Sequence, residues 1–548
     1  MSTPADTPAD TRAPWWRDAV IYQVYVRSFA SSGTRAGGPG IGDLPGITSR
    51  LPYLRDLGVD AVWITPFYRS PQHDHGYDVA DYLDVDPLFG SLADADDLVA
   101  RAHDLGIRVI VDLVPNHTSD EHAWFRAALA AAPGSPERAR YLFREGRGLD
   151  GGEPPNNWQS VFGGPAWTRV PDGPDGRSQW YLHLFDTSQP DLDWRNPEIG
   201  DMFESVLRFW LDRGADGFRV DVAHGLLKEE SLRDQVLPEG TEGRDPNQVR
   251  EEAMVARTDF DEPMWDQPEV HDVYRRWRRV LDEYDGDRMD VAEAWAKSLE
   301  AGALYVRPDE MNQSFNFLWL LADWSAQQFA DVVTGTFAAL DPVGATPTWV
   351  LSNHDVVRHV TRYGGGARGL ARARAATLTM LALPGSSYLY QGEELGLEQV
   401  DVAPQDRQDP SWFRTGEVGR DGCRVPMPWS GDTAPFGFSP DGSDQPWIPQ
   451  PAAWAALTVE AQAGDPDSTL ELYRAALAAR RTLPGDRDVD VRVEGEVLLV
   501  ERGDVTIALN CGTDAVALPD GDLLLASGPF GGVLPADTAV WVRRRSSR

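Results

Sequence analysis

Cysteines are few in this chain, long apolar runs are absent, and no leader sequence is expected. Its 548 residues include two cysteines, Cys423 and Cys511, which form neither a disulfide framework nor a CxxC metal-ligand spacing. No run of about 18 apolar residues occurs, so we expect no segment that crosses a membrane. The first residues, MSTPADTPADTRAPWW, have neither the basic region nor the apolar region of a signal peptide. These absences together predict a cytoplasmic protein.

Positive charge is scarce as well. The chain has 51 lysines and arginines against 86 aspartates and glutamates, which gives a formal net charge of −35 at pH 7. Such a chain repels phosphate groups, so we expect neither nucleic acid nor an anionic membrane as a partner, and a neutral small molecule suits it better as a substrate. Hydrophobic residues make up 42% of the chain, which is enough for a folded protein. The length exceeds what one compact core usually holds, so we expect two or more domains.

Apolar, β-branched runs alternate with helical patterns through most of the chain. Strands are predicted at 19–26, 61–66, 108–117, 216–222, 289–294, 313–320, 348–354 and 386–392, and the helices between them include 44–58, 91–106, 199–213 and 468–483. Ser91, followed three residues later by Asp94, gives one of these helices a start close to a capping box. Apolar strands separated by helices indicate a parallel sheet covered on both faces. Eight such units close a (β/α)8 TIM barrel, so the predicted fold class is α/β.

The alternation is interrupted twice and then replaced. Residues 118–195, after the third strand, are rich in glycine, proline, asparagine and tryptophan, which favours an inserted subdomain. Residues 225–265 form a second, irregular insertion. After residue 485, short strands separated by turns predict a C-terminal antiparallel β domain. The predicted organisation is a disordered stub (1–14), a barrel in two parts (15–117 and 196–485), the subdomain between them (118–195) and the β domain (486–548).

Three carboxylates stand at the ends of three different predicted strands: Asp221, Glu293 and Asp355. A single aspartate at a strand end is more often a helix cap or an ion-pair partner, so the inference depends on the three together, flanked by His117 and His354. In a TIM barrel these strand ends meet at one mouth. Carboxylates gathered there without metal-ligand spacing suit glycoside hydrolysis, in which one acts as nucleophile or base and another as proton donor.

Arg219 and Asp221 lie two residues apart in GFRVDVAHG, so their side chains point to the same face of the strand. We expect Arg219 to keep Asp221 ionised and to orient its oxygens, because a nucleophilic carboxylate must stay charged in a partly dry pocket. Glu293 is then the expected proton donor, held protonated by burial and by the neighbouring acids. Asp355 would help to bind and distort the sugar.

The motifs around these residues resemble those of the α-amylase family, glycoside hydrolase family 13, and the resemblance extends over nearly the whole chain. The family's strand motifs are similar to DLVPNH, GFRVDVAH, VAEAW and VLSNHD, in this order. QPDLDW resembles the QPDLNW of the branch that contains α-glucosidases and oligo-1,6-glucosidases. IYQVYVRSF, HDHGYDVADY, NNWQSVFGG and YQGEELGL also fit that branch.

The resemblance implies a role for each carboxylate. Asp221 matches the family's nucleophile, Glu293 its general acid/base and Asp355 its transition-state stabiliser. The family's glucose subsite matches Asp74, Tyr77, His117, Phe185, Arg219, His354 and Arg424. The implied mechanism is a two-step displacement with retention through a β-glucosyl-enzyme, with the two catalytic carboxyl groups about 5 Å apart.

Neither a metal nor another cofactor is expected. Many members of the family carry DxNxDGxGDL after the first strand, an acidic loop that binds calcium through oxygen ligands. The corresponding stretch here is SSGTRAGGPGIGDL (31–44), in which Asp43 is the only carboxylate. A calcium ion would therefore find too few ligands in this loop.

The resemblance favours a retaining, exo-acting α-glucosidase that releases the terminal non-reducing α-1,4-linked glucose of maltose and short malto-oligosaccharides. Positions 222 and 223 should face the bond that is cut, and their signals conflict. In this branch valine directly after the nucleophile, here Val222, often accompanies α-1,6 cleavage, whereas a small residue, here Ala223, accompanies α-1,4 cleavage. The alternatives are an oligo-1,6-glucosidase and, on the same scaffold, a trehalose synthase or a sucrose isomerase. A non-catalytic relative is disfavoured because all three acids are present, and the oligomeric state is left open.

Overall fold

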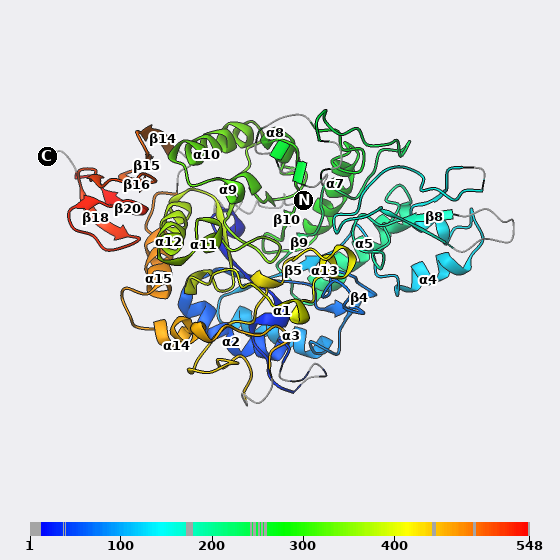
Figure 1. Cartoon of the computed structure of the whole chain (residues 1–548), viewed down its shortest axis with the longest axis horizontal. Coiled ribbons are helices and arrows are strands. Elements are labelled where there is room, and N and C mark those ends of the chain that lie inside the picture. The colour runs from blue at the N-terminus through cyan, green and yellow to red at the C-terminus, as the bar shows by residue number, and fades with distance from the viewer. Residues whose placement is uncertain are drawn as a thin grey trace, which may run out of the picture.

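Eight parallel strands form one sheet at the centre of the molecule (Figure 1). They are β1 (Val20–Val24), β2 (Ala61–Ile64), β5 (Arg108–Leu113), β9 (Gly217–Val220), β10 (Met289–Ala292), β11 (Gln313–Ser314), β12 (Thr348–Val350) and β13 (Ser386–Tyr390). The order in the sheet is β11-β10-β9-β5-β2-β1-β13-β12, and a parallel bridge between Asn316 and Trp349 joins its two ends. The predicted (β/α)8 barrel is therefore confirmed.

The structure describes residues 13–545 except 35, 37, 39, 149, 171–178, 242–243, 245–247, 250–251, 254–255, 257–259, 441–444 and 486–488. Residues 1–12 of the predicted stub therefore lie outside the described residues, as does part of the predicted insertion at 225–265. In the described part of the chain, no helix has the length and apolar character that crossing a bilayer requires.

Helices cover the outside of the barrel (Figure 1). They are α1 (Val26–Phe29), α2 (Leu44–Leu57), α3 (Leu92–Asp104), α5 (Pro197–Asp212), α7 (Val270–Leu281), α8 (Leu299–Leu304), α9 (Phe317–Leu321), α10 (Ala326–Leu340), α11 (His359–Arg362), α12 (Gly366–Ala382), α14 (Val459–Gln462) and α15 (Thr469–Arg480). The capping box of α3 is present: the Ser91 side chain accepts from the backbone N–H of Asp94, whose carboxylate accepts from the N–H of Ser91. The four helices named from the sequence thus correspond to α2, α3, α5 and α15.

One predicted strand is mostly helical. The sequence predicted a strand over 313–320, but β11 ends at Ser314 and α9 follows it. The Asn316 side chain accepts from the backbone N–H of Trp319 at 3.1 Å and so caps α9. A short apolar run such as FLWLL has no periodicity that separates a buried strand from a buried helix, which is why the prediction was wrong here.

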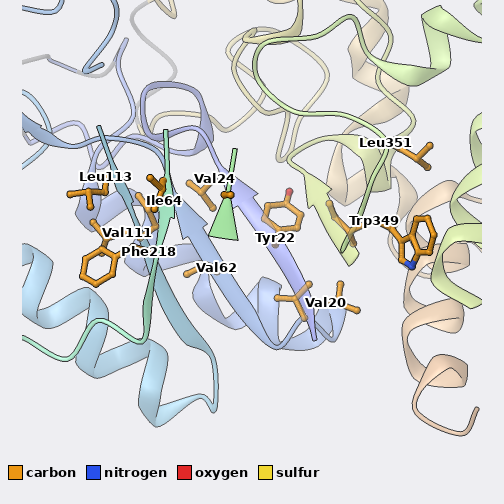
Figure 2. Close-up of a cluster of buried hydrophobic side chains, with 14 of the residues drawn as sticks. Val20, Tyr22, Val24, Val62, Ile64, Val111, Leu113, Phe218, Trp349 and Leu351 are labelled. Atoms are coloured by element: carbon orange, nitrogen blue, oxygen red, sulfur yellow. The ribbon is translucent and has the colours of Figure 1, made fainter. Parts of the chain in front are cut away.

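Side-chain alternation along the barrel strands separates two apolar cores. The outer core, between the strands and the helices, includes Val20, Tyr22, Val24, Val62, Ile64, Val111, Leu113 and Phe218 (Figure 2). The inner core, inside the barrel, includes Ile21, Trp63, Ile110, Met289, Val291 and Tyr388. Since Phe218 and Val220 belong to the outer core, Arg219 lies on the inner face of β9.

Two further sheets lie outside the barrel. Between β5 and α5 the chain forms α4 (Ala123–Ala130) and a small antiparallel sheet of β6 (Phe143–Glu145), β8 (Gln179–Leu182) and β7 (Trp167–Arg169), which we call subdomain B. The C-terminal antiparallel sheet has the order β14 (Val489–Glu494), β15 (Val497–Arg502), β16 (Val505–Asn510), β20 (Thr538–Arg543) and β18 (Asp522–Ala526). Two-stranded pairs are formed by β3 (Tyr68–Arg69) with β4 (Asp81–Val85) and by β17 (Val516–Ala517) with β19 (Val533–Leu534). Trp541 of β20 donates from Nε1 to the carbonyl of Leu378 in α12 at 2.9 Å, which attaches the C-terminal sheet to the barrel.

Asp43, the one carboxylate of the loop at 31–44, caps α2. Its Oδ1 accepts from the backbone N–H of Gly46 at 2.7 Å, and its Oδ2 accepts from the hydroxyl of Ser32 at 2.7 Å. Within the described ranges, no group of three or more His, Cys, Asp or Glu residues is placed to hold a metal ion. The carboxylate of Asp43 thus serves the start of a barrel helix.

A pair of buried glutamates follows β13. Glu394 Oε1 accepts from the hydroxyls of Tyr22 at 2.8 Å and Tyr53 at 2.7 Å. Glu393 Oε1 accepts from the backbone N–H of Tyr390 at 3.0 Å. Burial raises the pKa of Glu393 to about 8, so this side chain is protonated in the folded protein at neutral pH.

We predict that Glu393→Gln changes how the free energy of unfolding depends on pH. A glutamate has a pKa of about 4.3 in the unfolded chain, so between about pH 5 and pH 8 the folded wild type holds a proton that the unfolded chain has lost. The wild type should lose up to about 1.4 kcal/mol per pH unit from this group as the pH rises, whereas the variant should not. Urea unfolding at several pH values measures the difference, and parallel curves for the two proteins would contradict the assignment.

Candidate active site

A pocket of about 220 Å³ lies at the carboxyl ends of the barrel strands. Its lining is Asp74, Tyr77, His117, Val161, Phe162, Phe185, Asp221, Val222, His224, Trp265, Glu293, Trp295, His354, Asp355, Val356 and Arg420. These residues come from the barrel, from subdomain B and from the segment after β13. The three carboxylates predicted from the strand ends therefore do meet in one pocket.

The guanidinium of Arg219 lies just below the floor of the pocket and contacts two of these carboxylates. Its Nη1 donates to Oδ1 of Asp221 at 2.7 Å, and its Nη2 lies 2.8 Å from Oε2 of Glu293. Nη1 also donates to Oδ1 of Asp112 at 2.9 Å. The Arg219 side chain is 1% exposed and packs over the ring of Trp63. One buried cation thus contacts carboxylates from three neighbouring strands.

Burial affects the pKa values of Asp221 and Asp112 at least as strongly as Arg219 does. Burial raises the pKa of Asp221 well above the usual range, Arg219 opposes the rise, and Glu293 and Asp112 add to it. Burial likewise raises the pKa of Asp112 to about 6 against the effect of Arg219. The sequence-based expectation considered Arg219 alone. The structure adds a large opposing effect, because burial raises the pKa of Asp221 and of Asp112 against the effect of Arg219.

Glu293 is oriented by a strained turn that follows Asp221. Val222 has φ of 47°, a left-handed conformation that a β-branched residue rarely adopts. In this conformation its backbone N–H donates to Oε2 of Glu293 at 3.0 Å, while Trp295 Nε1 donates to Oε1 at 3.3 Å. The ring of Trp295 is stacked on that of Phe317, with centroids 4.0 Å apart. Both oxygens of Glu293 are therefore fixed relative to Asp221.

Asp355 lies on the side of the pocket among basic groups. Its Oδ1 accepts from Arg420 Nη1 at 3.0 Å and from Arg424 Nη2 at 2.9 Å, and Oδ2 is 3.2 Å from His354 Nε2. Burial alone would raise the pKa of Asp355, but these neighbours lower it below its usual range. Burial holds the pKa of His354 well below its ordinary value, so the two arginines supply the positive charge. Asp355 is thus held in its ionised form.

A second ion pair, between Arg420 and Asp74, also lines the pocket. Arg420 Nη2 donates to Oδ1 of Asp74 at 2.8 Å, and Gln189 Nε2 donates to Oδ2 at 3.1 Å. Beside them, Tyr77 stacks on His354, and burial lowers the pKa of His117 to about 4, so both imidazoles are neutral hydrogen-bonding groups. This part of the lining is therefore built from paired charges and neutral side chains, which suits hydroxyl groups.

The structure places eight of the ten predicted site residues in the lining, and the other two contact it from behind. Arg219 lies below the floor. Arg424 is fully buried, donates from Nε to the carbonyl of His354 at 2.9 Å, and does not face the pocket. Arg420, four residues earlier in GRDGCRVPMPW, takes the lining position instead. The sequence shows two arginines in that stretch but nothing that tells which one reaches the pocket.

Several lining residues were not predicted from the sequence: Phe162, Trp265, Trp295 and Arg420. The stretch NNWQSVFGG contains Phe162 and resembles the family, so position in a motif could have identified that residue. His224 stacks on Trp265 with ring centroids 4.9 Å apart and also lines the pocket. Ala223 was expected to face the pocket but is fully buried, and its carbonyl accepts from the hydroxyl of Tyr274.

Comparison with known proteins points to one family. Residues 23–484 match the family model for the catalytic domain of alpha amylase. The chain is similar to a probable alpha-glucosidase of Rhizobium meliloti, with 39% identity over 500 residues that cover 89% of this chain and 85% of that protein. It is also similar to an oligo-1,6-glucosidase of Parageobacillus thermoglucosidasius, with 34% identity over 506 residues that cover 85% and 84%.

Solved structures give the same result at the level of the fold. The alpha-glucosyl transfer enzyme XgtA has a TM-score of 0.85 at 38% sequence identity, covering 97% of this chain and 100% of that one. The trehalulose synthase MutB of Pseudomonas mesoacidophila has a TM-score of 0.83 at 28% identity, with the same two coverages.

We predict that Arg219→Met strongly destabilises the protein. The substitution leaves carboxylates buried without their cation, and breaking a buried pair in this way costs about 3–5 kcal/mol. Urea unfolding at pH 7 measures the loss. The double variant Arg219→Met/Asp112→Asn removes one stranded charge and should recover part of it, so a double variant less stable than the single one would contradict the charge argument.

Proposed function

The chain belongs to the α-amylase family of glycoside hydrolases, and we propose that it is a retaining, exo-acting α-glucosidase that hydrolyses the terminal non-reducing α-1,4-linked glucose of maltose and short malto-oligosaccharides. The observation that carries the proposal is the pair of carboxylates, Asp221 and Glu293, held on adjacent nitrogens of Arg219 at the floor of the pocket. That arrangement supports one carboxylate as nucleophile and the other as proton donor.

The first chemical step moves a charge from one carboxylate to the other. Arg219 holds Oδ1 of Asp221, so we assign the attack on the anomeric carbon to Oδ2. As the new C–O bond forms and the bond to the leaving sugar breaks, Glu293 gives its proton to the leaving oxygen. Asp221 becomes a neutral ester while Glu293 becomes ionised, so the summed charge of the two groups beside Arg219 stays constant. The guanidinium therefore needs no rearrangement during the step.

In the second step water restores both groups. Glu293 takes a proton from a water molecule that attacks the anomeric carbon, and the ester bond to Asp221 breaks, which releases glucose with its original configuration. Asp355 remains ionised throughout, and we assign it to stabilising the positive charge that develops on the sugar ring. The second step also explains why relatives can transfer glucose: another hydroxyl can replace the water.

The pocket supports exo action on one glucose unit. Its volume of about 220 Å³ is below the range of about 300–1,000 Å³ that is usual for ligand pockets, so it suits a single sugar ring better than a chain. The Asp74–Arg420 pair would bind the hydroxyls of the non-reducing ring. A chain would then enter by its non-reducing terminus.

Oligo-1,6-glucosidase activity is the second candidate, and one observation favours it. Val222 lines the pocket, whereas Ala223 is fully buried outside the lining. The residue whose type accompanies α-1,6 cleavage is therefore the one that faces the leaving sugar. The names of the relatives include both activities. A maltase is among these relatives, and its name supports α-1,4 hydrolysis, which we keep as the proposal.

We predict that Asp221→Asn lowers kcat on p-nitrophenyl α-glucoside by about four orders of magnitude, because an amide cannot serve as the nucleophile. The variant should keep its fold, since the substitution removes one buried charge. Circular dichroism and a melting curve provide the control. A folded variant that keeps more than about a tenth of the wild-type kcat would exclude Asp221 as the nucleophile.

The linkage preference is tested by measuring kcat/KM for maltose and isomaltose under the same conditions. We expect the higher value for maltose. One methylene in contact with the substrate changes the free energy of discrimination between two substrates by about 1–3 kcal/mol. Faster hydrolysis of isomaltose would show that Val222 determines the linkage. Product analysis with sucrose and maltose separates hydrolysis from isomerisation, because an isomerase would return a disaccharide.

A further inference from the structure

A short segment between the barrel and subdomain B carries a contact that the proposed mechanism does not use. This cover segment, residues 408–421, contains α13 (Pro410–Thr415), and its first and last residues contact each other. Asp421 Oδ2 accepts from the backbone N–H of Gln408 at 2.8 Å, and Arg420 Nε donates to Asp409 at 2.7 Å. The segment is thus a closed loop whose base includes the pocket residue Arg420.

The far side of the cover segment is held to subdomain B by Arg414. Its Nη2 donates to the carbonyl of Gly163 at 2.8 Å, and its Nη1 donates to Oδ1 of Asp186 at 3.2 Å. The two side chains are 17% and 16% exposed, so this ion pair is shielded from solvent far more than a surface pair. Gly163, with φ of 83°, packs so closely on Thr415 that a Cβ there would lie 2.6 Å from its methyl group.

Both anchor points directly follow phenylalanines of the pocket. Gly163 follows Phe162, and Asp186 follows Phe185. The two rings are in contact, with centroids 5.8 Å apart, and both line the pocket. They form one aromatic wall, and Arg414 contacts the residue that follows each ring, through the backbone carbonyl of Gly163 and the side-chain carboxylate of Asp186.

Hydrogen bonds also link Asp186, one of the two partners of Arg414, to the pocket residue Asp74. The backbone N–H of Asp186 donates to Gln189 Oε1 at 2.9 Å, and Gln189 Nε2 donates to Asp74. On the other half of the wall, the guanidinium of Arg420 packs over the Phe162 ring at 4.8 Å. The Asp221 and Glu293 carboxylates, by contrast, contact Arg219 at the floor. The wall and the floor are therefore supported by different groups.

We propose that Arg414 is a positioning residue that sets the affinity of the pocket for a glucose ring by holding the aromatic wall formed by Phe162 and Phe185. The proposal rests on the proposed function, because it takes a glucoside as the ligand. Arg414 does not line the pocket and acts through the two rings, which would pack against the apolar face of the sugar. Removing it should weaken binding more than it slows chemistry, because the floor keeps its own support.

The test compares Arg414→Ala with Arg407→Ala, a matched control in which the lost guanidinium donates to Val402 and packs over Trp412. We expect Arg414→Ala to raise KM for p-nitrophenyl α-glucoside and the inhibition constant of glucose about tenfold, with kcat changed less than about threefold. Arg407→Ala should leave all three constants within about twofold. Arg414→Lys, which keeps the charge but loses the planar fork, should lie between the wild type and Arg414→Ala.

Hydrogen exchange in the absence of sugar makes the test independent of activity. Arg414→Ala should speed exchange of the amides at 160–164 and 184–188 and leave those at 219–224 unchanged. Unchanged exchange at the wall would overturn the proposal, even if the wild type proved inactive on α-glucosides and the proposed function failed. Faster exchange at the wall with KM and the glucose constant unchanged would also overturn it, since Arg414 would then serve stability alone.

Discussion

One guanidinium beside three buried carboxylates is the interaction on which this pocket depends. Arg219 lies on β9, the strand between β5 and β10, and the register of the sheet pairs it directly with Asp112 on one side and Val291 on the other. From this position it reaches Asp112, Asp221 and Glu293. A slip of one residue in β9 would turn Arg219 to the outer face, among the apolar side chains that meet the helices. The contacts of Arg219 therefore require this strand register, and the slipped register would bury its charge without partners.

A second arginine, Arg420, pairs with carboxylates at the side of the pocket, but its partners lie much farther away in the sequence. Arg219 stands two residues from Asp221, whereas Arg420 is separated by more than 300 residues from Asp74, to which it donates. Arg420 also contacts Asp355 and Asp409, so it joins the hairpin after β2, the end of β12 and the cover segment. The first arginine comes with the barrel strand, while the second requires the completed fold.

This difference decides how much the sequence could reveal. Alternation along a strand is local, so the shared face of Arg219 and Asp221 and the gathering of strand-end carboxylates followed from the sequence pattern. Which of Arg420 and Arg424 enters the pocket depends on a loop whose path no periodicity encodes. The same limit applies to Ala223, which a left-handed Val222 turns away from the pocket. Tertiary context also decided the helix α9, where the apolar run itself fits a strand or a helix equally.

The floor and the aromatic wall of the pocket belong to two different parts of the chain. The floor belongs to the barrel, where a substitution disturbs buried charges, strand register and the inner core together. The aromatic wall belongs to subdomain B, and the apolar cluster that supports it also includes Val222 and Trp265 from the chain after β9. Mutations in the wall leave the contacts of Arg219 with Asp221 and Glu293 in place, because neither ring takes part in them. Over evolutionary time, a lineage could change the sugars it accepts while inheriting its reaction chemistry intact.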